Sequence, residues 1–307
     1  MLAYILKRLF QAILILIGVT LVAFFLLFVI PADPAQMMAG RGYTNEQTIA
    51  TIRDQLGLDN PFFEQYLRYV TRLLEGDLGR SYLQKSEVSE LIWSRLPATA
   101  LLLAGAIFFE IVIGLTMGLF ASLRRGSRLD QGLMVASFVF ASTPQFLMGI
   151  LLLYLFAVHL DWFPMGGYGT LAHLVLPALT LGVLGAGWYS RLMRSSMIDV
   201  LHQDFIRTAR AKGLRPAVVV LVHAMPNAIL PIIALIGSDV GYFLSQTVVV
   251  ESVFGWPGIG QLAWQAIQRI DIPIIMGVTV VTACAVVLGN LVADLIAPLI
   301  DPRIKMQ

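Results

Sequence analysis

Three acidic residues lie inside long apolar stretches of the sequence, where charged side chains are least expected. They are Glu110, Asp239 and Asp294. A carboxylate within a membrane is costly and often belongs to a path for a polar solute or ion, while hydrogen bonding inside a helix bundle is the ordinary structural alternative. We expect Asp239 and Glu110 to line such a path. Asp294, near the end of its stretch, suits a structural role.

Residues that usually bind metals or perform nucleophilic chemistry are scattered along the chain. Four histidines occupy expected loops and helix ends without the spacing of metal ligands, and Cys284 stands alone in an apolar stretch. The sequence contains no phosphate-binding glycine loop and no His-Glu-x-x-His motif. Asp239 and Asp294 also lack the Tyr-Asp and Gly-x-Gly-Asp settings of intramembrane aspartyl proteases. We therefore predict a chain that is not an enzyme and has no catalytic residue, cofactor or metal site.

Apolar residues determine the fold class. Hydrophobic residues make up 58% of the 307 residues and charged residues 13%, with a mean hydropathy of +0.79. Most of the long apolar stretches approach or exceed the roughly 20 residues that cross a bilayer. Because lipid offers no hydrogen-bond partners, each should be helical. We predict an all-α polytopic membrane protein with six transmembrane helices, at about 9–30, 98–123, 132–158, 174–190, 228–250 and 274–297.

Basic residues divide unequally between the two sides of these helices. If the N-terminus is cytoplasmic, the inner segments carry thirteen Lys and Arg residues, and the two short outer loops carry only Arg269. Cytoplasmic loops of membrane proteins are enriched in Lys and Arg. We therefore predict a multi-pass protein of the cytoplasmic (inner) membrane with both termini in the cytoplasm. The first apolar run is too long for a signal-peptide core, so we expect it to be retained.

The segment that follows the first helix is too long to be a simple connector. Its residues 44–47 resemble a capping box that opens a helix, Gly57 can end that helix, and Asn60-Pro61 can open a second one rich in aromatic residues. This outer subdomain could be a lid on the membrane helices or a docking surface for an outer partner. We predict a transmembrane helix at 1–30, an extracytoplasmic subdomain at 31–97 and a core transmembrane domain at 98–307.

A long cytoplasmic segment, at about 191–227, separates the fourth and fifth predicted helices. Its first part should continue the fourth helix to Leu201, and a short helix should follow at about 204–213. Leu201, Phe205 and Ala209 recur every four residues and predict one apolar face. Basic residues suit the end of the short helix, where its dipole is negative, and Gly213 can supply a left-handed cap. The sequence therefore predicts a structured helix lying across the cytoplasmic face.

This segment resembles the Glu-Ala-Ala loop of binding-protein-dependent ABC permeases. In that loop a glycine follows the second alanine by four residues, and a proline follows 13 residues later. Ala209, Gly213 and Pro226 match this spacing, whereas Arg207 and Thr208 replace the acidic residue and the first alanine. The run Arg-Thr-Ala-Arg-Ala-Lys-Gly-Leu is similar to the variant of the dipeptide, oligopeptide and nickel permease branch.

Other segments extend the resemblance over essentially the whole chain. They are the Leu-Lys-Arg-Leu-Phe lead, Asp33-Pro34, residues 55–61, residues 76–79 and the run from Val250 to Gly260. Within the branch, the chain is similar to the first of two paralogous permeases. The resemblance implies the type I ABC importer permease architecture and a role in import of short peptides. Import of nickel chelates or glutathione-like peptides by the same machinery, or ion-coupled secondary transport, remains an alternative.

The resemblance also implies partners. These are a second, paralogous permease, two cytoplasmic ATPases that bind ATP and Mg, an extracytoplasmic solute-binding protein, the transported solute and membrane lipid; nucleic acid is not among them. The expected ATPase-coupling residues are Asp204, Phe205, Arg207, Thr208, Ala209, Arg210, Ala211, Lys212, Gly213 and Pro226. A secondary transporter would usually contain internal repeats, and none is apparent between residues 1–150 and 151–307. An ion-driven carrier would also have no reason to hold a docking helix in this loop.

Overall fold

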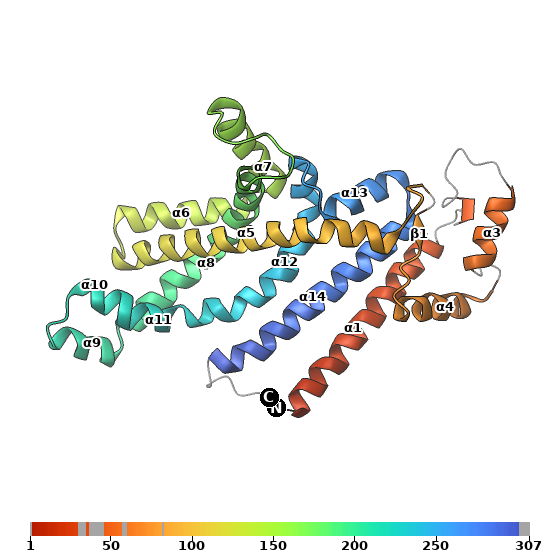
Figure 1. Cartoon of the computed structure of the whole chain (residues 1–307). Coiled ribbons are helices and arrows are strands. Elements are labelled where there is room, and N and C mark those ends of the chain that lie inside the picture. The colour runs from red at the N-terminus through yellow and green to blue at the C-terminus, as the bar shows by residue number, and fades with distance from the viewer. Residues whose placement is uncertain (1, 30–34, 37–45, 57–59, 82, 301–307) are drawn as a thin grey trace. The chain divides into compact units, whose positions relative to one another are not determined.

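The computed structural model describes residues 2–29, 35–36, 46–56, 60–81 and 83–300. These residues form two compact units, one built from 100–256 and 288–300 and the other from 2–99 and 257–287. The elements are labelled in Figure 1. The predicted capping residue Thr44 and the predicted helix end at Gly57 lie outside the described residues.

Long apolar helices dominate the described part of the chain. By length and composition, five helical segments can cross a membrane: Ile5–Leu26, Val88–Leu123, Leu171–Leu201, Pro216–Ile233 and Ile272–Val292. A bent pair, Arg128–Ser142 with Gln145–His159, raises the number to as many as six. The structure is therefore the all-α, multi-span protein that the sequence predicts.

Helices are the only regular secondary structure among the described residues of the first unit. Its elements are α5 (Val88–Leu123) from residue 100 onward, α6 (Arg128–Ser142), α7 (Gln145–Leu152), the π-helix η1 (Leu153–His159), α8 (Leu171–Leu201), α9 (Asp204–Ala211), α10 (Pro216–Val218), the π-helix η2 (Val219–Ala224), α11 (Met225–Ala228), α12 (Leu230–Phe254) and the end of α14 (Ile272–Ile300). Helix α8 packs against α6, α7 and α12, so it is the central helix of this unit.

The third predicted helix, 132–158, is wrong as a continuous span. The chain bends by 111° between α6 and α7. Thr143 ends α6 in an extended conformation, with φ −77° and ψ 128°, and Pro144 precedes α7. A residue before proline is disfavoured in the helical region, because the proline ring contacts its backbone. The apolar pattern continues through this bend, which explains why hydropathy alone missed it.

Other helix boundaries differ from the prediction in instructive ways. Helix α5 begins at Val88, ten residues before the predicted start, because the charged residues that end its apolar window do not end the helix. Helix α8 reaches Leu201, which confirms the predicted helical continuation of the fourth span. The fifth span was predicted at 228–250. The helix α12 covers nearly this range, but the apolar segment that meets the membrane criterion lies earlier, at Pro216–Ile233.

Glycines bring α5 and α8 into direct backbone contact. A Cβ atom added at Gly114 would lie 2.5 Å from the Cβ of Tyr189, and one added at Gly118 would lie 2.5 Å from the Ser190 carbonyl oxygen. A Cβ atom added at Gly182 of α8 would likewise lie 2.6 Å from the Ala106 carbonyl oxygen of α5. Small residues that let two helix backbones approach this closely are typical of helix contacts in membrane proteins.

The second unit contains the described parts of the segment that was predicted to lie outside the membrane helices. Its elements are α1 (Leu2–Val29), α3 (Glu46–Leu56), α4 (Phe62–Leu74), the strands β1 (Arg80–Ser81) and β2 (Ser86–Glu87), α13 (Ile259–Arg269), and the first parts of α5 and α14. The two strands pair antiparallel. The aromatic residues predicted for the second outer helix pack on α1: the Phe24 ring lies 5.4 Å from Phe62 and 5.7 Å from Tyr66.

Helix α13 was not predicted, because the sequence analysis gave residues 261–269 no secondary structure between the run that ends at Gly260 and the last predicted span. It is an amphipathic helix that buries Ile259, Leu262 and Ala266. Asp271 follows it and accepts a hydrogen bond from the hydroxyl of Ser81. Burial raises the pKa of the Asp271 carboxyl, and hydrogen bonds from Ser81 and from the backbone of Ile274 oppose that rise.

Candidate functional site

A cavity of about 650 Å³ lies among α5, α8 and α12. Its polar lining includes Glu110 of α5, Tyr189 of α8 and Asp239 of α12. The structure therefore brings together the two acids that the sequence predicted along a path, although they are 129 residues apart in the chain. That they line a route for solute stays a prediction.

The two carboxylates differ in their hydrogen bonding. The Tyr189 hydroxyl donates a hydrogen bond to the Asp239 carboxylate. Glu110 is 2% exposed, and its Oε2 has no hydrogen-bond partner within the part of the chain that the structure describes. A Cβ added at Gly185 would collide with the Glu110 carboxylate, so this glycine makes room for the acid. The Glu110 side chain is thus held against α8 with one oxygen unsatisfied.

Aromatic rings and one cation complete the cavity wall. Trp188 and Tyr242 line the cavity and are 65% and 47% exposed. The guanidinium of Arg191 lies 4.5 Å from the Trp188 ring and 4.7 Å from the Phe138 ring, which are cation–π distances. The cavity therefore combines two carboxylates, one guanidinium and aromatic surface, a lining suited to a small molecule that carries both charges.

Sequence reasoning missed Tyr189 and Arg191 as parts of this site. Arg191 served only as evidence for topology, and Tyr189 received no role. A signal for Tyr189 was available, because a tyrosine hydroxyl within a predicted membrane helix usually needs a hydrogen-bond partner when it is buried. Tyr189 is 3% exposed.

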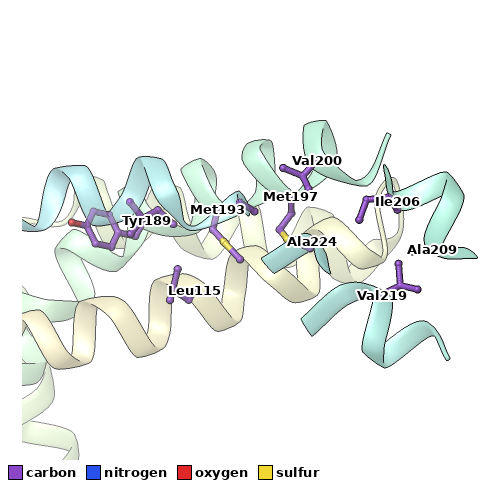
Figure 2. Packing of buried hydrophobic residues seen from close by; sticks show 11 residues of the cluster. Leu115, Tyr189, Met193, Met197, Val200, Ile206, Ala209, Val219 and Ala224 are labelled. Atoms are coloured by element: carbon purple, nitrogen blue, oxygen red, sulfur yellow. The ribbon is translucent and has the colours of Figure 1, made fainter. Parts of the chain in front are cut away.

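Helix α8 connects the cavity directly to the predicted docking helix. From Tyr189 to Leu201 the helix extends about 18 Å, at about 1.5 Å per residue. A single cluster of buried side chains follows this length and continues into α9 and η2 (Figure 2). It includes Met193 and Met197 of α8 and Ile206 of α9. A displacement of α9 would therefore be transmitted to α8 through packed side chains.

The apolar face predicted for the docking helix is partly wrong. Ala209 is buried as expected, but its partner in the core is Ile206, at 0% exposure, and Phe205 is 41% exposed. The prediction continued the four-residue repeat from Leu201 into α9. The helix instead breaks at His202 and Gln203 and restarts at Asp204, which rotates the buried face by one residue.

The exposed side of α9 contains most of the predicted coupling residues. Apart from Ala209, all of them are exposed: Asp204, Phe205, Arg207, Thr208, Arg210, Ala211, Lys212, Gly213 and Pro226. Gly213 has φ +75°, and its N–H donates to the Arg210 carbonyl at 3.0 Å, so the predicted left-handed cap is confirmed. Contact of this surface with an ATPase stays a prediction.

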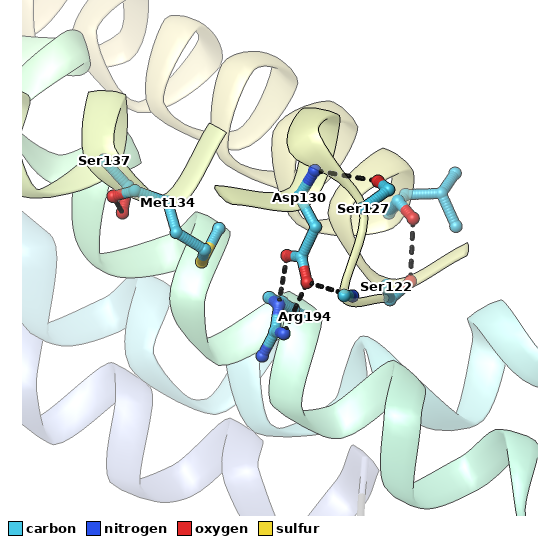
Figure 3. Close-up of polar contacts among 8 residues, drawn as sticks. Ser122, Ser127, Asp130, Met134, Ser137 and Arg194 are labelled. Atoms are coloured by element: carbon cyan, nitrogen blue, oxygen red, sulfur yellow. Dashed lines mark hydrogen bonds and ion pairs between the residues drawn. The ribbon is translucent and has the colours of Figure 1, made fainter. Parts of the chain in front are cut away.

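A buried ion pair ties α6 to α8 between the cavity and α9. The Arg194 guanidinium donates to both oxygens of Asp130, at 2.6 and 2.7 Å (Figure 3). The Gly126 N–H also donates to Asp130, and the Ser127 hydroxyl accepts from the Asp130 N–H as the cap of α6. The Asp130 side chain is 4% exposed and that of Arg194 is 28% exposed. This pair fixes the start of α6 against α8.

Neither the cavity nor α9 has the features of a metal centre. Among the residues that the structure describes, no group of three or more His, Cys, Asp or Glu side chains is placed to hold a metal ion. The arrangement can bind and orient a polar molecule in the cavity, and it can transmit force along α8.

Comparison with known proteins identifies the family. Residues 110–306 match the family described as "Binding-protein-dependent transport system inner membrane component", and residues 1–103 match the N-terminal component of the same system. The chain belongs to this family of membrane permeases from ABC importers.

Individual relatives match along the full chain. The chain is 38% identical to the oligopeptide transport system permease protein AppB of Bacillus subtilis, covering 99% of this chain and 100% of that protein. It is also 38% identical to the glutathione transport system permease protein GsiC of Salmonella paratyphi A, covering 100% of both. The fold is similar to a structure of the MetNI methionine ABC transporter, with a TM-score of 0.54 and 18% identity over 68% of this chain and 96% of that one.

Proposed function

We propose that this chain is a permease subunit that lets short peptides cross the cytoplasmic membrane in an ATP-driven importer. The observation that carries the proposal is full-length similarity to a permease named for oligopeptide transport. The acidic cavity supports it, because a cavity of about 650 Å³ with both charges present can accommodate a small zwitterion. Glutathione is itself a peptide, so similarity to a glutathione permease fits the same proposal.

In this proposal the chain pairs with a paralogous second permease, and each permease receives one ATPase that binds ATP and Mg. A solute-binding protein delivers peptide at the outer face. Helix α9 docks on the ATPase through its exposed residues, and α8 carries the resulting movement to the cavity. A rigid helix that links a docking element to a ligand cavity is the mechanical part that such coupling needs.

Uptake measurements test the proposed solute. A strain that lacks this chain is compared with its parent for uptake of a labelled dipeptide and of labelled nickel, with and without ATP depletion. Loss of ATP-dependent dipeptide uptake in the deletion strain is the expected result. Loss of nickel uptake alone would keep the mechanism and replace the solute, and unchanged uptake of both would contradict the proposal for these solutes.

The proposal also places both termini and α9 in the cytoplasm. In the predicted topology, thirteen basic residues fall in the segments assigned to the same side as α9 and only Arg269 falls in the two short loops of the other side, and this asymmetry of the sequence supports the proposal. A tag at the C-terminus should stay protected when protease is added to right-side-out cells. Cleavage of the tag in intact cells would overturn this topology.

A further inference from the structure

The acidic cavity leaves one strong hydrogen-bond acceptor unused. Glu110 is 2% exposed, lines the cavity and has an Oε2 without a partner among the described residues. Buried polar groups are nearly always hydrogen-bonded, so an exception calls for an explanation such as a missing ligand or water. The cavity that Glu110 lines has a volume of about 650 Å³, which falls in the range of small-molecule sites.

The groups around the unused oxygen define the chemistry of a ligand. A carboxylate accepts hydrogen bonds and donates none, so both Glu110 and Asp239 require donors. The Tyr189 hydroxyl already uses its one O–H to donate a hydrogen bond to Asp239, which leaves the phenol oxygen as a further acceptor. Three acceptors from three helices therefore meet in one cavity. A primary ammonium group carries three N–H donors and a positive charge, and hydrogen bonds between charged groups are the stronger kind.

The rest of the lining favours a zwitterion over a simple cation. Arg191 lines the same cavity and is positively charged, while Trp188 and Tyr242 supply aromatic surface. A polyamine would meet the guanidinium with like charge, whereas the carboxylate end of a peptide would meet it with opposite charge. A bare metal ion would find only two carboxylates among the described residues, since no group of three metal-binding side chains of the usual kinds forms there.

We propose that Glu110, Asp239 and Tyr189 form a subsite that holds the free α-ammonium group of a peptide during passage. This inference rests on the proposed function, because it names the end of the transported peptide that this chain recognises. In it, a peptide whose amino group is acetylated loses both the charge and two of the three donors. The subsite therefore discriminates against acetylated peptides within the permease itself.

Chemical modification of Glu110 tests the subsite directly. Dicyclohexylcarbodiimide reacts with carboxyl groups in apolar surroundings, and mass spectrometry can follow its addition to Glu110 in the detergent-solubilised complex of this chain with its partner subunits. Three probes are compared: Ala-Ala, N-acetyl-Ala-Ala and Mg²⁺. We expect Ala-Ala to slow modification about fivefold or more, and the other two probes to have no effect. Asp239→Asn should abolish the protection by Ala-Ala.

A matched pair of variants links the subsite to transport. Glu110→Gln keeps the shape of the side chain and removes its charge, and Glu90→Gln makes the same change at an exposed position on the same helix. In proteoliposomes that contain the whole complex, Glu110→Gln should lower the uptake of Ala-Ala about tenfold, the effect of losing one hydrogen bond to a charged group. Glu90→Gln should transport like the wild type.

The outcomes separate this inference from the proposed function. Equal protection by N-acetyl-Ala-Ala, protection by Mg²⁺ alone, or no protection would overturn the ammonium subsite. If the wild-type complex still accumulates Ala-Ala in any of those cases, the peptide function stands without the subsite. If the complex accumulates no Ala-Ala, the peptide function fails, and the labelling result still decides whether the cavity binds an ammonium group.

Discussion

Replacing Gly213 with proline should separate ATP hydrolysis from transport while leaving the membrane helices intact. Gly213 has φ +75° and donates its N–H to the Arg210 carbonyl at 3.0 Å, which ends α9. Proline fixes φ near −65° and has no N–H, so it can neither adopt this conformation nor make this bond. No side chain or backbone atom outside the local chain lies within 4 Å of a Cβ at this position, so the effect is confined to the backbone.

The size of the effect follows from the two losses. An ordinary non-glycine residue is disfavoured in the left-handed region by about 1–2 kcal/mol, and proline, which cannot adopt it, loses at least this much. The lost hydrogen bond adds about 0.5–1.5 kcal/mol, which gives a total of about 1.5–3.5 kcal/mol. Helix α9 has eight residues and buries Ile206 and Ala209. Because isolated helices of this length are marginal in water, the last turn of α9 should unfold instead of bearing the strain.

The assay measures ATP hydrolysis and dipeptide uptake on the same proteoliposomes. We expect Gly213→Pro to lower uptake about tenfold or more, since 1.4 kcal/mol corresponds to a factor of ten, while hydrolysis continues. Gly76→Pro is the matched control: Gly76 has φ +82° and donates to the Leu73 carbonyl at 3.0 Å after α4, far along the chain from α9. Normal uptake by Gly213→Pro would refute the proposal that α9 transmits movement of the ATPase to α8.

Three further predictions concern stability, measured by thermal unfolding of the purified chain. Gly118→Ala should destabilise by about 1–3 kcal/mol through overpacking against α8, whereas Gly18→Ala, which has open space, should not. Asp130→Asn should destabilise the protein by about 1–3 kcal/mol, because it breaks the bidentate pair with Arg194. Adding Arg194→Gln to this variant should recover part of the lost stability. If the effects of the two substitutions were fully additive, coupling between Asp130 and Arg194 would be contradicted. Burial raises the pKa of Asp271, so its stabilising contribution is present at acidic pH and lost as pH rises through the raised pKa. The free energy of unfolding of Asp271→Asn, relative to that of the wild type, should therefore be higher at pH 7 than at pH 4. A difference between the two proteins that does not change with pH would refute this.

The sequence predicted the membrane helices well where apolar length alone decides the structure. The first and last spans, the helical continuation to Leu201 and the left-handed cap at Gly213 are all found in the structure. The break at Pro144 and helix α13 were missed for opposite reasons. The first occurs within an unbroken apolar pattern, and the second is a short amphipathic helix in a segment with strong turn signals.

The sequence indicated which residue types belong to the candidate site, but not which residues come together to form it. Unusual acids inside apolar stretches drew attention to Glu110 and Asp239. Their meeting in one cavity depends on how α5, α8 and α12 pack, which a single sequence does not encode in any local pattern. Tyr189 was overlooked because its role exists only through its hydrogen bond to Asp239. The face of α9 was misassigned because one break in the chain changes the helical register.

The glycine contacts between α5 and α8 have a mechanical consequence. Because not even a methyl group fits between these two backbones at the glycines, α5 and α8 are in direct backbone contact there. We expect them to move as one body, with Glu110 and Tyr189 keeping a constant separation. Asp239 stands on a different helix, joined to that body at the cavity by a hydrogen bond. Opening and closing of the cavity would thus change the Tyr189–Asp239 distance. A spectroscopic probe at this contact would report the transport cycle.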